Sequence, residues 1–389
     1  MPNGCSKPCE HRKVDALKVF FRADASLQIG TGHVMRCLTL ADALTALGSD
    51  CQFICRELQG NLIELIRSKG YITHVLPRAE FIDAKAPAPT PRKSLPPHAQ
   101  WLGTSQEEDA TACENILIEA CPDWLVVDHY ALDARWEVAL KPHYAKLLVI
   151  DDLADRPHDC DVLLDQTLGR SGDEYEALVP VNCQTLCGSQ YALLRPEFAA
   201  LRDYSLRRRV KSEVRQLLIT LGGVDKGNAT GDVLEALRDC RLPADCSITV
   251  IMGPTAPWLA EVEQKAQQLP WATTVLVGVS DMARLMAESD LAIGAAGSTA
   301  WERCCLGLPT VMLVLADNQR GVALGLARAK AAEAIEEPQA IRARLPDLLN
   351  RLIENADALS SMSKAALSVV DGRGVEAVSE IMESTRATN

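Results

Sequence analysis

The sequence predicts an α/β protein with two doubly wound, Rossmann-like domains that face each other across an interdomain cleft. Short apolar runs alternate with helical patterns from residue 18 onward, which is typical of a parallel sheet with crossover helices. This alternation restarts after a charged stretch at residues 201–214. The length of 389 residues suits two domains of ordinary size. We therefore expect an N-terminal domain over residues 17–205 and a C-terminal domain over residues 206–389.

The N-terminal domain follows a tail, residues 1–16, whose mixed polar composition predicts flexibility. Apolar runs predict strands over residues 18–21, 51–55, 72–76, 124–127, 146–150 and 162–164. Apolar residues spaced three and four apart predict helices over residues 33–47, 61–68, 106–120 and 134–140. Several prolines between residues 77 and 103 exclude a helix or a central strand, so we expect an exposed insertion over residues 77–103.

The C-terminal domain repeats the same alternation. Strands are expected over residues 216–221, 247–252, 273–277, 290–293 and 309–315. Helices are expected to end at Leu237, to run from Asp281 to Glu288, and to begin at Ala300. The chain after residue 320 is mostly helical, with a break at residues 371–374, and we expect the last helices to pack back on the N-terminal domain. The arginines of the charged stretch are expected to form a solvated surface.

Composition and charge exclude several classes of protein. Forty basic against 52 acidic residues give a net charge of −12 without a long basic run, so we expect no nucleic-acid partner. No apolar run approaches 18 residues and the first 16 residues show no signal-peptide pattern, which predicts a cytoplasmic protein without a membrane partner. We expect a monomer.

The cysteines predict neither disulfides nor a metal site. The 14 cysteines are scattered through a long chain, as is typical of reduced, buried thiols. The chain contains no C-x-x-C pair and no H-E-x-x-H helix. We therefore expect no metal and no cofactor.

The first candidate site is the turn between the apolar run at residues 18–21 and the next helix. Gly30 and Gly32 allow the backbone to turn tightly and to approach a ligand. His33 follows in the first turn of the helix, where free backbone N–H groups favour an anion. This combination indicates a phosphate-ester site, with Arg22 and Arg36 as nearby positive charges. The alternative is an ordinary turn in which His33 only caps the helix.

Polar residues also follow the next strands of the same sheet. His129 and Tyr130 come directly after the strand at residues 124–127, so we expect them on the same edge as His33. The alternative is that Asp128 caps the following helix. For Asp151 and Asp152 we expect a capping or turn role.

The second candidate site is the glycine turn at residues 294–299. It follows a strand and precedes a helix, but lacks the Gly-Lys-Ser/Thr of an ATP-binding P-loop. Its backbone N–H groups and the hydroxyls of Ser298 and Thr299 suit a diphosphate, and Glu302 one turn later suits a ribose diol. The alternative is that Ser298 or Thr299 is a simple N-cap. Residues 316–319 emerge on the same edge.

These motifs resemble, in order, those of the UDP-sugar hydrolases of pseudaminic acid biosynthesis. The similar blocks are R-A-D at residues 22–24, G-T-G-H-V-M-R-C at 30–37, D-H-Y at 128–130, D-D-L-A-D-R at 151–156, Y-A-L-L-R-P-E-F at 191–198, T-L-G-G-V-D at 220–225, G-S-T-A-W-E at 297–302 and A-D-N-Q at 316–319. The resemblance covers about residues 18–319 and implies a GT-B-like architecture.

The resemblance implies cleavage of UDP-2,4-diacetamido-2,4,6-trideoxy-β-L-altropyranose to UDP and the free sugar. Water attacks the anomeric carbon with inversion in this family, and no metal is required. The resemblance further implies that His33 is the general base and that Tyr130 and Asn318 position the water or the sugar. The remaining substrate-binding residues that we expect are Arg22, Asp24, Gly32, Arg36, Arg195, Gly223, Gly297, Ser298, Thr299 and Glu302.

Two other functions remain open at this point. A GT-B glycosyltransferase that uses a UDP-sugar donor would have the same nucleotide-binding half. We see no apolar or basic membrane-facing patch for a lipid acceptor in the N-terminal half. A UDP-sugar-binding regulator without catalysis would retain Ser298 and Glu302 but would not need His33.

Overall fold

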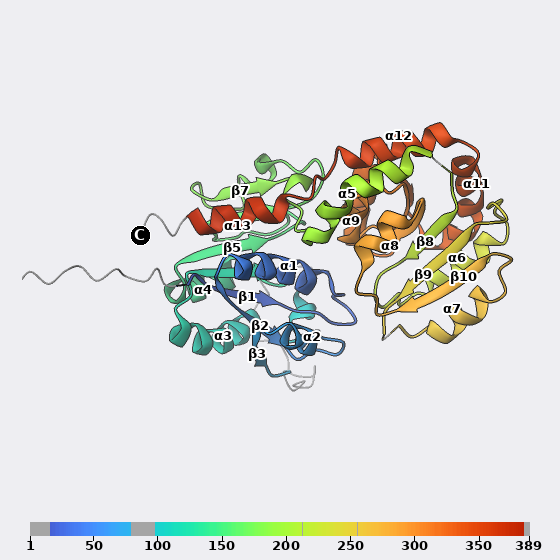
Figure 1. Cartoon of the computed structure of the whole chain (residues 1–389). Helices are drawn as coiled ribbons and strands as arrows, with labels where there is room; N and C mark the ends of the chain where they lie inside the picture. The colour runs from blue at the N-terminus through green and yellow to red at the C-terminus, as the bar shows by residue number, and fades with distance from the viewer. Residues whose placement is uncertain (1–15, 79–97, 212, 255, 385–389) are drawn as a thin grey trace, which may run out of the picture.

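The structure is a computed structural model that describes residues 16–78, 98–211, 213–254 and 256–384. The predicted tail lies outside the described residues apart from Ala16, and the predicted insertion is described only at its two ends. Two separate parallel sheets are present, one in each half of the chain (Figure 1). This arrangement confirms the predicted α/β class with two doubly wound domains.

The N-terminal sheet has seven parallel strands in the order β3-β2-β1-β4-β5-β6-β7. Their bounds are β1 Lys18–Ala23, β2 Asp50–Arg56, β3 Ile72–Leu76, β4 Trp124–Asp128, β5 Lys146–Ile150, β6 Val162–Asp165 and β7 Gln184–Cys187. The helices are α1 Gly32–Ala46, α2 Ile63–Ser68, α3 Gln106–Ala120 and α4 Ala134–Leu140, with short 3₁₀ turns η1 Ala99–Leu102, η2 Lys141–His143, η3 Gly172–Tyr175 and η4 Ser189–Tyr191. The chain order reverses between β1 and β4, so a crevice opens where these two strands end.

Helices cover both faces of this sheet. Alternate residues of β1 face opposite ways: Phe21 packs in the same cluster as residues of α1, whereas Phe20 packs with residues of α3 and α4. Central strands buried on both faces read as continuous apolar runs, which is why the sequence identified them.

The C-terminal sheet has six parallel strands in the order β10-β9-β8-β11-β12-β13. The strands are β8 Gln216–Thr220, β9 Ser247–Met252, β10 Ala272–Val277, β11 Leu291–Ala295, β12 Thr310–Leu313 and β13 Glu333–Ile335. The helices are α6 Ala229–Leu237, α7 Leu259–Ala266, α8 Met282–Glu288, α9 Thr299–Cys305, α10 Arg320–Arg328, α11 Ile341–Ile353 and α12 Ala356–Leu367, with η6 Asp317–Gln319 and η7 Pro338–Ala340. The chain order again reverses at the centre, between β8 and β11.

The last helix, α13 Gly374–Ser384, packs on the N-terminal domain beside α1 (Figure 1). Val378 and Met382 are buried in the same apolar cluster as Leu38 of α1. The indole Nε1 of Trp124 donates a hydrogen bond to the Met382 carbonyl at 3.2 Å. The polypeptide therefore crosses between the two domains twice, once through α5 and once before α13.

The charged stretch around residue 205 is a helix rather than an open link. The helix α5 Pro196–Arg208 continues into the 3₁₀ turn η5 Arg209–Lys211, so the expected boundary falls inside α5. The expectation that its arginines form a solvated surface is wrong for Arg202 and Arg209. Arg202 donates to the carbonyls of Cys305, Leu367 and Val370, and Arg209 donates to three other carbonyls. These guanidinium groups hold helix ends of the C-terminal domain together.

Candidate active site

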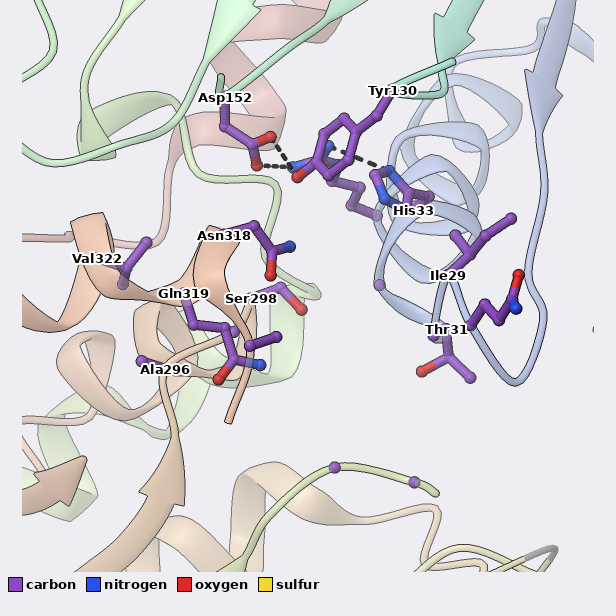
Figure 2. A pocket seen from close by; sticks show the side chains of 18 of the residues that line it. Ile29, Thr31, His33, Tyr130, Asp152, Ala296, Ser298, Asn318, Gln319 and Val322 are labelled. Carbon is purple, nitrogen blue, oxygen red and sulfur yellow. Dashed lines mark hydrogen bonds and ion pairs between the residues drawn. The ribbon is translucent and has the colours of Figure 1, made fainter. Parts of the chain in front are cut away.

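A cavity of about 490 Å³ lies between the two domains, at the carboxyl ends of both sets of strands (Figure 2). Its lining includes residues that the sequence singled out in both halves of the chain. These are Gly30, Gly32, His33, Arg36, Tyr130, Gly223, Gly297, Ser298 and Asn318. The two candidate sites predicted from the sequence therefore form one site across the interdomain cleft.

The two glycine turns face each other directly. A Cβ atom on Gly32 would lie 3.5 Å from the Ser298 hydroxyl, so the turn before α1 and the turn before α9 are in near contact. Gly30 adopts a φ of +81°, which favours glycine. His33 projects from the first domain and Asn318 and Ser298 from the second toward the same space (Figure 2). A ligand in this space touches both domains.

The His33 imidazole is held from behind by a buried carboxylate. Its Nδ1 lies 2.5 Å from Asp128 Oδ1, and because a carboxylate only accepts hydrogen bonds, the ring proton is placed on Nδ1. The Nε2 atom then carries the lone pair. His33 lies in α1, whose N-cap residue is Thr31, so capping does not explain its position. This arrangement suits a general base.

Arg36 links Asp128 to the neighbouring strand end. Its Nε and Nη2 donate to Asp128 at 2.5 and 2.7 Å, and its Nη1 donates to Asp152 at 3.0 Å. Burial alone would raise the pKa of Asp128, but the charge of Arg36 and the hydrogen bond to His33 hold that pKa well below its usual range. Asp128 is therefore an ionised partner of His33 rather than a helix cap.

Tyr130 packs edge-on against the His33 ring, with 4.6 Å between the ring centroids. Its hydroxyl donates to Asp152 Oδ1 at 2.5 Å (Figure 2). Burial, followed by the charge of Asp152, raises the pKa of Tyr130 far above its ordinary value, so the phenol stays protonated. Tyr130 thus fixes the orientation of His33. Asp152, for which a turn role was expected, belongs to the site instead.

Two of the expected substrate contacts are buried beneath the cleft. Arg22 and Asp24 are 0% and 1% exposed, and neither lines the cavity. Arg22 pairs with Asp24 and Asp109, and Arg56 also donates to Asp109. His129 Nε2 lies 3.3 Å from Asp24 Oδ2, and His129 does not line the cavity either. The expectation that Arg22 and Asp24 touch substrate is therefore corrected, because these side chains form an ionic platform under the turn. His129 follows the end of β4, at the edge where His33 lies, but it contacts this platform rather than the cavity.

The C-terminal wall is formed by backbone and small polar side chains. Ser298 is the N-cap residue of α9 but makes no capping hydrogen bond through its hydroxyl, and it is exposed to the cavity. Gly223 and Gly253 approach so closely that a Cβ on Gly253 would lie 1.9 Å from the Gly223 carbonyl. Asn318 lies exposed on η6. Thr299 faces the other way, because its hydroxyl accepts a hydrogen bond from Arg303.

Arg195 and Glu302 meet each other at the junction of the domains. Arg195 Nη2 lies 3.7 Å from Glu302 and Arg195 Nη1 lies 3.1 Å from Glu197. Neither Arg195 nor Glu302 lines the cavity as it stands. Burial raises the pKa of Glu302 to about 7, although Arg195 opposes that rise. The Glu302 carboxyl therefore changes its ionisation near neutral pH.

The cavity also contains side chains that the sequence reasoning missed. Trp101 and His98, whose ring centroids are 4.4 Å apart, lie on and beside η1 after the proline-rich segment. Gln166 and Thr167 follow β6, and Gln28 and Ile29 stand before Gly30. Only the rule that ligands gather at strand ends could have identified Gln166 and Thr167. Nothing in the local sequence marks Trp101.

Other expectations concern absences, which the structure addresses only for its described residues. All twelve cysteines in the described ranges are free. No cluster of three metal-ligating side chains is found in that part of the chain. None of its helices combines the length and the apolar character needed to cross a bilayer.

Comparison with known proteins places these features in a family context. Residues 225–380 match the family model of the glycosyltransferase family 28 C-terminal domain. The chain is 28% identical over 313 residues to the UDP-2,4-diacetamido-2,4,6-trideoxy-beta-L-altropyranose hydrolase of Campylobacter jejuni, covering 80% of this chain and 97% of the relative. It is also 28% identical over 202 residues to the spore coat polysaccharide biosynthesis protein SpsG of Bacillus subtilis, covering 50% and 57%. The resemblance inferred from the motifs is confirmed.

Solved structures agree on the architecture. MurG of Acinetobacter baumannii matches with a TM-score of 0.66 at 15% identity, over 95% of this chain and 99% of MurG. WaaG, a glycosyltransferase involved in lipopolysaccharide biosynthesis, matches with a TM-score of 0.51 at 16% identity, over 94% and 99%. At such identities the likeness concerns the fold, and it confirms the GT-B-like arrangement of two Rossmann-like domains.

Proposed function

We propose that this chain, which has a GT-B-like fold and resembles the UDP-sugar hydrolases of pseudaminic acid biosynthesis, cleaves UDP-2,4-diacetamido-2,4,6-trideoxy-β-L-altropyranose to UDP and the free sugar. The observation that carries this proposal is the placement of one imidazole, His33, opposite the glycine turn of the other domain. Gly32 and Ser298 approach each other across the cleft, so a bound diphosphate at the turn lies close to the base.

In the proposed reaction, His33 Nε2 takes a proton from a water molecule as that water attacks the anomeric carbon. The new bond forms to the water oxygen, the bond between the anomeric carbon and the diphosphate oxygen breaks, and the configuration inverts. Asp128, 2.5 Å from Nδ1, stabilises the imidazolium that results. Tyr130 keeps the ring in position, and Asn318 from the opposite wall orients the water or the sugar.

UDP leaves with developing negative charge on its diphosphate. The amide N–H groups of Gly297 and Ser298 take part in no backbone hydrogen bond in the described part of the chain, so both are available as donors to the leaving group. The Gly223 backbone and the Ser298 hydroxyl line the same wall. These groups support departure of UDP without a resident metal ion.

The reaction is tested by incubating the protein with a panel of UDP-sugars and no acceptor. UDP release and the anomeric configuration of the product are followed by NMR. We expect release from the diacetamido-trideoxy sugar nucleotide with inversion. The family 28 domain match makes glycosyl transfer a second candidate, and release only after an acceptor is added would favour it.

Removal of divalent cations is expected to leave the hydrolysis rate unchanged. The leaving group is stabilised by backbone donors of the Gly297 turn, so a metal ion has no required part in the proposed chemistry. The rate is measured with and without excess EDTA. A loss of activity that magnesium restores would contradict the metal-independent scheme.

The Glu302→Gln variant is expected to bind UDP more weakly and with a flatter pH dependence than the parent protein. In the proposal, ionised Glu302 accepts hydrogen bonds from the ribose diol, and with a pKa of about 7 it ionises as the pH rises from 6 to 8. UDP affinity of the parent protein should therefore rise over that range. Calorimetric titrations at pH 6, 7 and 8 measure this.

The diphosphate of UDP also ionises near this pH range. Its contribution to the affinity is the same for the variant and the parent protein, so it cancels in the ratio of their dissociation constants. Glu288→Gln is the matched control, because Glu288 forms a surface pair with Arg284 away from the cavity. A UDP dissociation constant that is the same for Glu302→Gln and the parent protein at all three pH values would remove Glu302 from the ribose role.

A further inference from the structure

A buried arginine lies directly behind the glycine turn of the C-terminal wall. The Arg303 side chain is 0% exposed. Its Nη2 donates to the Ala295 carbonyl at 2.7 Å and its Nη1 donates to the Thr299 hydroxyl at 3.1 Å. A Cβ on Gly294 would lie only 2.5 Å from Nη1, so glycine at this position leaves room for the guanidinium. Arg303 therefore spans the underside of the turn from residue 294 to residue 299.

The opposite side of the same turn faces the cleft. Ala296, Gly297 and Ser298 line the cavity, and the N–H groups of Gly297 and Ser298 donate to no backbone carbonyl in the described part of the chain. The turn is thus a single layer of backbone, with a cation on one side and the proposed diphosphate position on the other.

Arg303 differs from the other deeply buried arginines. Arg22, Arg36, Arg56 and Arg156 each form an ion pair with at least one aspartate. In the described part of the chain, Arg303 forms no such pair, and its Nε has no hydrogen-bond partner. Its neighbour in sequence, Glu302, contacts Arg195 instead.

An unpaired buried cation is costly, because the charge loses its hydration without gaining a counter-ion. Burial lowers the pKa of Arg303 to about 10, a value at which the guanidinium is still protonated at neutral pH. The charge of Glu302 opposes this fall in the pKa, but Glu302 forms no ion pair with Arg303, so the guanidinium has no directly paired carboxylate among the described residues. An anion bound on the other side of the turn would provide the compensation.

We propose that Arg303 is a positioning residue that attracts the diphosphate of the nucleotide through the Gly294–Thr299 turn and holds that turn in its binding conformation. The ligand class is a diphosphate or its nucleoside ester. This inference rests on the proposed function, because it assigns the counter-ion to the leaving group of that reaction.

The test compares Arg303→Met and Arg303→Lys with the parent protein. The probes are UDP, uridine and inorganic pyrophosphate, titrated by calorimetry. For Arg303→Met we expect at least a tenfold loss of affinity for UDP and for pyrophosphate, and less than a twofold change for uridine. Arg303→Lys retains the positive charge and should lose less affinity for UDP and pyrophosphate than Arg303→Met. The melting temperature of ligand-free Arg303→Met should equal or exceed that of the parent protein, since methionine removes an uncompensated buried charge.

Arg202→Met is the matched control. Arg202 also donates to backbone carbonyls, at 2.7 to 2.8 Å, but it holds helix ends away from the cavity. This variant should lower the melting temperature and leave the affinity ratio of UDP to uridine unchanged.

The possible results separate the two proposals. If Arg303→Met loses equal affinity for UDP and uridine, or loses affinity for neither, the proposed role of Arg303 is overturned. The proposed function is not affected by that result. A parent protein that binds pyrophosphate but not UDP would overturn the nucleotide assignment. The role of Arg303 would still be supported in that case if Arg303→Met has a lower affinity for pyrophosphate. A parent protein that binds neither probe would overturn both.

Discussion

Replacing His33 with asparagine is expected to lower kcat by about 10²–10⁴-fold, the usual contribution of a general base. His33 is the imidazole in the cavity whose Nδ1 is fixed by a buried carboxylate, at 2.5 Å from Asp128. Asparagine retains a polar side chain at this position but cannot take the proton from water. The dissociation constant for UDP should stay within about twofold, because the proposed UDP contacts belong to the other domain. Steady-state rates and calorimetric titrations measure the two quantities separately.

A control variant is His143→Asn. His143 pairs with Glu114 at 3.1 Å and does not line the cavity, so its replacement should leave kcat unchanged. If kcat of His33→Asn falls by less than about tenfold, a barrier change of roughly 1.4 kcal/mol, His33 is not the essential base. A large loss of UDP affinity would instead indicate that His33 holds the nucleotide.

The sequence predicted most of the fold because its central strands are buried on both faces. Strands such as β4 Trp124–Asp128 and β5 Lys146–Ile150 appear as uninterrupted apolar runs, within a residue of the predicted bounds. One edge strand of each sheet was missed, whereas the opposite edge strands, β3 and β10, were predicted. β7 Gln184–Cys187 and β13 Glu333–Ile335 have only four and three residues, and with the polar residues that they contain, such short runs do not stand out from a loop.

The helix α5 was missed for a different reason. Its sequence is rich in arginine, and it has a low apolar content that is typical of a link. The side chains of Arg202 and Arg209 are buried because they donate hydrogen bonds to carbonyl groups about 80 to 170 residues further along the chain. The local sequence gives no information on where those carbonyl groups lie.

Within the candidate site, the sequence predicted which strand ends meet but not which side chains reach the cavity. His33, Tyr130, Ser298 and Asn318 line it together, as the motifs had suggested. Arg22 has the same local signature as Arg36, an arginine near a glycine turn. Arg22 is held in the interior by its ion pair with Asp109 of α3, which lies 87 residues further along the chain. An ion pair between residues so far apart produces no recognisable sequence pattern. The position of an arginine within a motif therefore could not show whether its side chain contacts the ligand or only supports the residues that do.

Replacing Asp128 with asparagine is expected to reduce both catalysis and stability. Asparagine cannot stabilise the imidazolium of His33, so kcat should fall by at least about tenfold. It also leaves Arg36 with Asp152 as its remaining carboxylate partner. Removing one partner of a buried ion pair costs about 3–5 kcal/mol, and the free energy of unfolding should fall by a comparable amount at pH 7. Denaturant titrations and steady-state rates measure the two effects.

The pH dependence distinguishes a lost ion pair from a general packing defect in Asp128→Asn. The folded-state pKa of Asp128 lies well below its ordinary value of 3.8. Its ionisation therefore stabilises the parent protein fully above that ordinary value, and this stabilisation is lost as the pH falls toward the folded-state pKa. The stability difference between Asp128→Asn and the parent should be constant from pH 7 to pH 5 and should shrink below about pH 4. A packing defect would give a difference independent of pH, which would contradict the assignment of Asp128 as an ionised partner of His33 and Arg36.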